Sequence, residues 1–89
     1  MKSITIAIPI FTSNRYYKED KLNAESLREH LTGLLERFEN KGLLLYKGAC
    51  TRHTVRVPED VANKIKELAK DYNITILTLT SSLSNMFYY

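Results

Sequence analysis

The sequence predicts an α+β domain in which a four-stranded antiparallel sheet carries two helices on one face. One observation is a hydrophobic spacing, i, i+4, i+7, i+8 and i+11, that occurs twice and gives one apolar stripe on each of two α-helices. The two stripes are Leu27, Leu31, Leu34, Leu35 and Phe38, and Val61, Ile65, Leu68, Ala69 and Tyr72. The other observation is a strand-like run before and after each stripe. The chain is therefore predicted to form strand–helix–strand twice in succession.

The first half of the pattern starts with residues 4–8, which alternate with the period of a β-strand. Pro9 predicts that this strand ends or bulges there, because proline cannot donate to a sheet ladder. Asn23 is a favourable N-cap for the first helix, and Gly42 can take the left-handed conformation that closes it. The apolar residues 43–46 are predicted to form the second strand.

The second half starts at Lys47-Gly48, a predicted tight turn of a hairpin that leads into the alternating residues 53–57. Pro58, followed by acidic residues, predicts the start of the second helix. Asn73 predicts its end, since asparagine is the usual substitute for glycine at that position. Residues 74–80 are rich in strand formers and are predicted to form the fourth strand, paired with the first.

Two strand–helix–strand units joined by a hairpin resemble a ferredoxin-like βαββαβ domain, and the resemblance covers residues 3–80. The nucleotide-binding PII-like regulators are similar to this pattern in their core, and they oligomerise. The resemblance therefore implies an oligomeric protein that binds a nucleotide. The ligand motifs of those regulators are not recognisable here, so no binding residue is carried over from them.

A competing local pattern is found in residues 53–75, which resemble a ribbon-helix-helix DNA-binding motif. In that family a short strand precedes two helices, and outward strand residues of a dimer enter the major groove. The resemblance implies that Thr54 and Arg56 read bases and that residues 76–88 form the second helix. Against it, that segment is rich in serine and threonine, which are mediocre helix formers. Its apolar residues with helical spacing are Ile76, Leu79, Leu83 and Met86.

Size and composition limit the class of protein. A chain of 89 residues has room for one domain, and 44% hydrophobic with 26% charged residues is typical of a globular protein. The net charge of +3 is spread over both halves, so charge alone does not indicate nucleic acid. The single Cys50 fits a reducing compartment, and residues 4–11 are too short to span a bilayer. The sequence predicts a soluble cytoplasmic protein.

No motif predicts an enzyme. Cys50 and His53 have the chemistry of a thiolate and its base, but three residues apart on a strand they tend to face opposite sides. Two histidines and one cysteine without ligand spacing predict no metal site, and the scattered glycines form no phosphate loop. His30, beside the first apolar stripe, is interpreted as a boundary residue. The expected protein is non-catalytic and has no cofactor.

A ligand site is predicted at one edge of the four-stranded sheet. Residues 12–21 are predicted to form a long loop, and long ordered loops are often functional. At the same edge lie the turn between strands two and three and the loop after the second helix. Cations there provide charge for a phosphate, and tyrosine rings can stack on a base or a sugar. The predicted ligand-binding residues are Arg15, Tyr16, Tyr17, Lys18, Lys47, Arg52, His53 and Asn73.

The sheet face turned away from the helices is the last predicted surface. It exposes Leu44 and Tyr46, or Leu77 and Leu79, and an apolar patch has to be covered. The tail at 81–89, with three consecutive aromatic residues, or a second copy of the chain provides the cover. The preferred function is a homo-oligomeric binding module that captures an anionic small ligand, a nucleotide. The alternatives are a ribbon-helix-helix repressor and a small inhibitor that docks on another protein.

Overall fold

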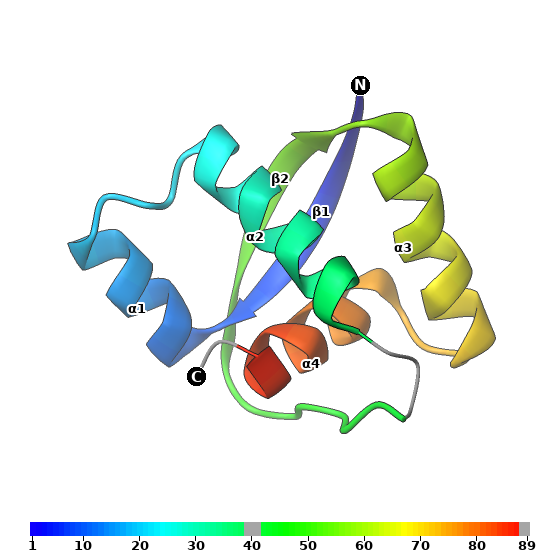
Figure 1. Ribbon diagram of the computed structural model, residues 1–89. Helices are drawn as coiled ribbons and strands as arrows, with labels where there is room; N and C mark the ends of the chain where they lie inside the picture. The colour runs from blue at the N-terminus through cyan, green and yellow to red at the C-terminus, as the bar shows by residue number, and fades with distance from the viewer. Residues whose placement is uncertain (39–41, 88–89) are drawn as a thin grey trace.

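The computed structural model describes residues 1–38 and 42–87, and in these ranges the chain forms two strands and four helices (Figure 1). Each strand is followed by two helices, so that the order is strand–helix–helix twice. The elements are β1 (Lys2–Pro9), α1 (Ile10–Lys18), α2 (Ala24–Arg37), β2 (Cys50–Val57), α3 (Glu59–Asp71) and α4 (Ile76–Phe87).

The predicted four-stranded ferredoxin-like sheet is wrong, because the sheet contains only β1 and β2 within the described ranges. Residues 43–46 are irregular, which removes the second strand and the hairpin after it. Residues 74–80 contain the start of α4, and residues 12–21, predicted as a loop, belong mostly to α1. The strands predicted at 4–8 and 53–57 are confirmed, as are the two helices with apolar stripes, which are α2 and α3.

The two strands are antiparallel, with Lys2 opposite Val57, Thr5 opposite Thr54 and Pro9 opposite Cys50. One face of this ribbon is buried, as the alternation predicted. Its inward aliphatic residues are Ile4, Ile6, Ile8, Val55 and Val57. They pack with apolar residues of α2, α3 and α4, so the core lies between the ribbon and these helices.

Pro9 remains in β1 without loss of a ladder hydrogen bond. Ala7, two positions earlier, points its N–H away from β2 and donates to Thr80 Oγ1 at 2.9 Å. Alternate residues of an antiparallel strand point their backbone groups to the same side, so the nitrogen of Pro9 also faces away from β2. The next residue, Ile10, donates its N–H to the carbonyl of Ala49 at 3.0 Å.

The helix α4 forms where strand propensity predicted a β-strand. Thr75 caps it, because its Oγ1 accepts from the N–H of Thr78 at 3.1 Å. Leu79 and Leu83 are buried in the core on one face of the helix. Hydroxyl residues fill the other faces and are also buried: Thr80, Ser81, Ser82 and Ser84. Burial of residues 79–84 on every face of the helix therefore overrides their weak helix propensity.

The buried hydroxyls of α4 are hydrogen-bonded, and these bonds offset the free-energy cost of removing the hydroxyls from water. Thr80 Oγ1 donates to the carbonyl of Ile76 at 2.9 Å, and Ser81 Oγ donates to that of Thr78 at 3.1 Å. Ser82 Oγ accepts the N–H of Tyr46 at 2.9 Å. No buried side-chain nitrogen or oxygen of the described residues lacks a partner.

The two strand–helix–helix halves match each other around the ribbon. Residues 5–9 read Thr-Ile-Ala-Ile-Pro and residues 54–58 read Thr-Val-Arg-Val-Pro. The first residues of these segments, Thr5 and Thr54, lie directly opposite each other. An antiparallel ribbon in which matching residues face each other has a local two-fold axis between them. The axis therefore passes between Thr5 and Thr54.

The match continues into the helices. Asp20 and Asn73, in the turns between the two helices of each half, both have a φ of 55°. Asn23 caps α2 through the N–H three residues on, as predicted, and Thr75 caps α4 in the same manner. The buried leucines of the second helices correspond as well: Leu27 and Leu31 in α2, Leu79 and Leu83 in α4. Gly42 has the predicted positive φ, 124°, but α2 has already ended before it.

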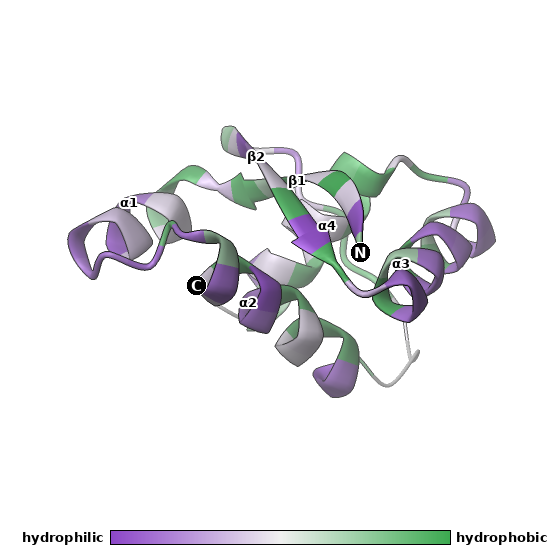
Figure 2. Ribbon diagram, turned by 90° about the horizontal axis from the view of Figure 1, so that it is seen from above, coloured by the Kyte–Doolittle hydropathy of each residue, from purple (hydrophilic) through white to green (hydrophobic). Residues whose placement is uncertain are grey.

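Each second helix contacts the strand of the other half: α2 packs against β2 and α4 against β1, and the two helices also contact each other. One cross-half hydrogen bond joins each pair. Arg28 Nε donates to the carbonyl of Arg56 at 2.9 Å, and the Ala7 N–H donates to Thr80 Oγ1. The halves are thus interlocked. Figures 1 and 2 show α1 and α3, the first helices, on opposite sides of the ribbon.

Candidate nucleic-acid interface

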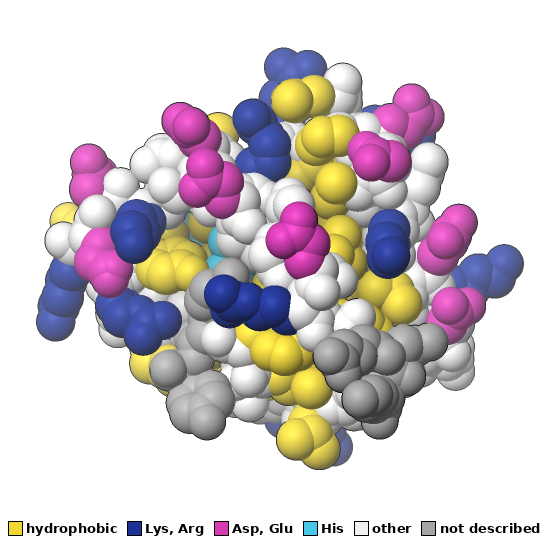
Figure 3. Space-filling view, in the orientation of Figure 1, with side chains coloured by type: hydrophobic (Ala, Val, Ile, Leu, Met, Phe, Trp, Pro, Cys, Tyr) yellow, Lys and Arg dark blue, Asp and Glu magenta, His cyan; other side chains and the backbone are white. Residues whose placement is uncertain are grey.

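The outer face of the ribbon is exposed and polar. Since successive residues of a strand point to opposite faces, the inward aliphatic residues leave their neighbours turned outward. The exposed residues of this face are Ser3, Thr5, Cys50, Arg52, Thr54 and Arg56. Neither strand contains an acidic residue. Figure 3 shows the opposite side of the molecule, over α2, where acidic and basic side chains are interspersed.

The outward residues are held by the backbone around them. Thr5 Oγ1 lies 3.4 Å from Thr54 Oγ1 at the centre of the ribbon. Arg56 is opposite Ser3, and its carbonyl is fixed by the hydrogen bond from Arg28 on α2. Arg52 is four positions away on the same face of β2, about 13 Å along the strand. A rigid two-stranded ladder therefore presents both guanidinium groups to solvent.

A shallow depression of about 210 Å³ lies beside Arg52. Lys47, from the segment before β2, and the first turns of α4 form its other walls, and none of its lining residues is acidic. Lys47 and Arg52, two of the predicted ligand residues, thus line the same depression, although the four-stranded sheet that motivated the prediction is wrong. The depression gives the Arg52 end of the ribbon a second cation.

The other predicted ligand residues do not form a single site with these two. Arg15, Tyr17 and Lys18 are exposed on α1. Asn73 lies in the turn after α3, and Figures 1 and 2 show α3 on the other side of the molecule from α1. Tyr16 is buried, and the Arg15 guanidinium carbon lies 5.9 Å from the centre of its ring. Nucleotide binding therefore stays a prediction without an assembled pocket.

His53 lies on the inner side of the ribbon, where it is half-buried opposite Ile6. Its Nε2 is 2.8 Å from Thr51 Oγ1, and Thr51 Oγ1 donates to Ser13 Oγ at 2.8 Å. Burial lowers the pKa of His53 from 6.5. This histidine therefore helps to join β2 to α1, and it does not reach the outer face with Arg52.

His30 is buried between α1, α2 and α4, and not at a boundary as interpreted from the sequence. Its Nδ1 lies 3.0 Å from the Tyr16 hydroxyl, and its Nε2 lies 2.8 Å from Ser84 Oγ. Burial, with a smaller contribution from the charge of Arg37, lowers the pKa of His30 to about 4. A neutral imidazole, with one donor and one acceptor nitrogen, satisfies both hydroxyls.

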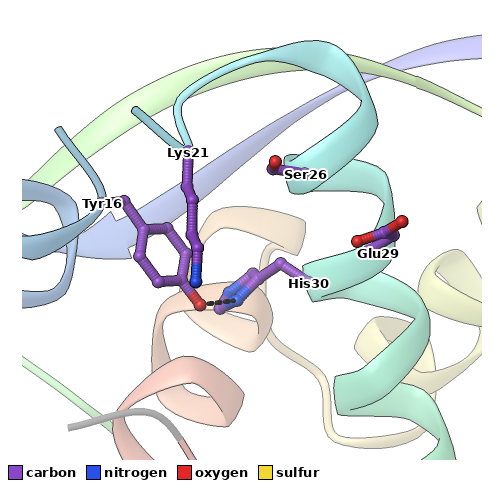
Figure 4. Close-up of a pocket in the computed structure, with 5 residues that line it drawn as sticks. All are labelled: Tyr16, Lys21, Ser26, Glu29 and His30. Atoms are coloured by element: carbon purple, nitrogen blue, oxygen red, sulfur yellow. Dashed lines mark hydrogen bonds between the residues drawn. The ribbon is translucent and has the colours of Figure 1, made fainter. Parts of the chain in front are cut away.

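The ring of His30 reaches one wall of a cavity of about 190 Å³ (Figure 4). Tyr16, Lys21, Ser26 and Glu29 form the rest of its lining. The Ser84–His30 distance is that of a nucleophile and its base, but Ser84 is completely buried, so a substrate has no access to its hydroxyl. The network thus has a structural explanation, the joining of three helices.

The predicted apolar patch on the sheet is wrong, because the outer face is polar and Leu79 is buried. Exposed apolar side chains occur instead before β2, where Leu44 is 74% exposed, and at the start of α1, where Phe11 contacts Tyr46 edge to face. In the predicted tail, Phe87 packs against the core, and Tyr88 and Tyr89 lie outside the described residues. Assembly into an oligomer stays a prediction.

The structure and the comparisons were also searched for a membrane span, a metal site and related proteins. No helix in residues 1–38 or 42–87 combines the length and apolar character that a bilayer span requires. The same ranges hold no group of three His, Cys, Asp or Glu side chains arranged to bind a metal ion. Comparison of the chain with protein-family models, curated proteins and solved structures finds no match.

Proposed function

We propose that this protein binds duplex DNA by placing the outer face of the β1–β2 ribbon in the major groove. The observation that carries the proposal is the exposed, acid-free row of Arg52, Thr54 and Arg56 on a two-stranded ribbon. The major groove is wide enough for such a ribbon, and its base edges present patterns that side chains can distinguish. A protein that reads bases through a ribbon needs this combination of shape and exposed polar groups.

The side chains of the row have the chemistry that base edges recognise. Arginine donates two parallel hydrogen bonds to O6 and N7 of guanine, and threonine offers a hydroxyl and a methyl group. Arg52 and Arg56 can each make such a bidentate contact, with Thr54 between them. The hydrogen bond from Arg28 uses the backbone carbonyl of Arg56 and leaves its guanidinium available.

Cations near the ribbon supply the sequence-independent part of binding. Neutralisation of DNA phosphates by lysine and arginine releases counterions and dominates affinity at low salt. Lys47, in the depression next to Arg52, is placed to contact a phosphate when the ribbon occupies the groove. We therefore expect the affinity for DNA to fall as the salt concentration rises.

The element order supports the same proposal. The resemblance of residues 53–75 to the ribbon-helix-helix motif requires a second helix after residue 75, and α4 lies there. In that family a dimer supplies the two strands of the ribbon. Here β1 and β2 of one chain pair with each other, so a single chain provides the whole ribbon. The proposal therefore needs no second copy.

Substitution of Arg56 by alanine tests the proposal. Duplexes that the protein binds are first enriched from a random-sequence pool, and affinity for an enriched duplex is then measured by fluorescence anisotropy. Loss of one bidentate arginine contact is expected to cost about 1–3 kcal/mol, a decrease in affinity of about 5- to 150-fold. Arg15→Ala, on α1, is the matched control and is expected to change affinity little. Equal losses in both variants, or no enriched sequence, would contradict the proposal.

A further inference from the structure

The ribbon combines a symmetric backbone with asymmetric side chains. The local two-fold axis between Thr5 and Thr54 relates each outward position of β1 to one of β2. The axis relates Ser3 to Arg52, each two residues before the central threonine of its strand. It relates Ala7 to Arg56, each two residues after that threonine. Of these three outward pairs, only the central threonines are identical.

The differences between related positions change the chemistry that DNA would meet. Arg52 and Arg56 are exposed cations, whereas Ser3 is a short hydroxyl and Ala7 is only 5% exposed. Both arginines of the outer face therefore belong to β2. At one end of the ribbon Arg56 stands opposite Ser3, and at the other Arg52 stands opposite the covered Ala7. The two ends do not repeat each other under the axis.

The surroundings of the two ends differ as well. The depression with Lys47 and the start of α4 adjoins the end with Ala7 and Arg52. At the other end, Lys2 forms an ion pair with Glu59 on α3 at 3.5 Å. At the Lys2 end, the cation next to the ribbon is thus paired with a carboxylate. At the Arg52 end, the depression that holds Lys47 has no acidic residue in its lining.

Symmetry in a DNA-binding protein is mirrored by symmetry in its site, since related side chains contact related base pairs. We propose that one chain binds a non-palindromic duplex site, in which Arg52 and Arg56 read base pairs that no dyad relates. The inference rests on the proposed DNA binding and adds the class of site and the stoichiometry to it. A symmetric ribbon built from two copies would instead select a palindrome.

Sequencing of the duplexes enriched from a random-sequence pool tests the inference directly. The expected result is a consensus without two-fold symmetry, with one chain per duplex in native mass spectrometry. A palindromic consensus bound by two chains would overturn this inference and leave DNA binding intact. No enrichment together with no binding to any duplex would overturn the proposed function and this inference with it.

A variant that restores part of the symmetry sharpens the test. Ser3 is exposed, so Ser3→Arg places a cation at the position that the two-fold axis relates to Arg52, without disturbing the core. Its affinity is measured for a duplex in which the base pairs read by Arg52 are repeated about the dyad. The variant is expected to bind this duplex about 5- to 150-fold more tightly than the parent protein does. Ser3→Gln, longer than serine but uncharged, is the matched control, and an equal gain with glutamine or no gain with arginine would contradict the inference.

Discussion

Replacement of Leu83 by alanine is expected to lower the free energy of unfolding by about 2–5 kcal/mol, the usual cost of a buried leucine. Leu83 is 1% exposed and belongs to the core cluster that joins α4 to the ribbon. Its counterpart in α2, Leu31, is also 1% exposed, so Leu31→Ala is expected to lose a similar amount. Urea denaturation followed by far-UV circular dichroism measures both losses.

Leu44→Ala is the matched control for these variants, because Leu44 is 74% exposed. Surface substitutions change stability by about 0.5 kcal/mol or less. The contrast also discriminates between the two folds, since the predicted four-stranded sheet made Leu83 part of a terminal tail. A loss in Leu83→Ala no larger than that in Leu44→Ala would show that α4 is not packed in the core.

Because of His30, the free energy of unfolding is expected to decrease as the pH is lowered below about 6.5. The pKa of His30 is about 4 in the folded chain and 6.5 without the fold, so the unfolded state binds the proton first. The contribution of the neutral ring is complete above pH 6.5 and is lost as pH falls toward 4. A difference of this size corresponds to about 3 kcal/mol.

His30→Gln isolates this effect from the titration of carboxylates. Glutamine keeps a donor and an acceptor for Tyr16 and Ser84 but carries no proton in this range. Unfolding free energies of the parent and the variant are compared between pH 4 and pH 7, and the parent is expected to have the steeper decline. His53→Gln is the control at the half-buried histidine. Identical slopes for the parent and His30→Gln would rule out the titration of His30 as the cause.

The elements that could be predicted from the sequence are those whose signal is local. The apolar stripes of α2 and α3 repeat with helical spacing, and the alternation in both strands shows directly which face is buried. Asn23 and Asn73 also give local signals. Asn23 caps α2 through the N–H of Ser26, and Asn73 takes the left-handed conformation after α3, with a φ of 55°. The local signals did not, however, determine how many strands the sheet has.

The sequence predicted a loop in place of α1 and a strand in place of the start of α4. Both predictions were wrong because contacts between residues distant in sequence stabilise these helices. Thr12, Ser13 and Asn14 are weak helix formers, and α1 is attached through Ser13 to β2 and through Tyr16 to α2. In α4 the serine and threonine hydroxyls bond back to the helix or accept from distant groups. The helix propensity of individual residues does not include these long-range contacts.

The candidate interface was predictable only in part. Arg52 and Lys47 were singled out for their charge, and Thr54 and Arg56 came from the resemblance to the ribbon-helix-helix motif. The sequence also contains a repeat at 5–9 and 54–58, in which Thr and Pro flank two branched residues. It points to equivalent strands, but the pairing of Thr5 with Thr54 requires the fold.

The central claim, that the outer face of the ribbon contacts duplex DNA, is tested most directly by nuclear magnetic resonance of the ¹⁵N-labelled chain. Backbone amide signals are recorded as an enriched duplex is added. The account predicts that the largest shifts occur at Ser3, Thr5, Arg52, Thr54 and Arg56, with smaller shifts around Lys47. Shifts confined to α1 and the turn at Asn73, or an unchanged spectrum with every duplex, would contradict it.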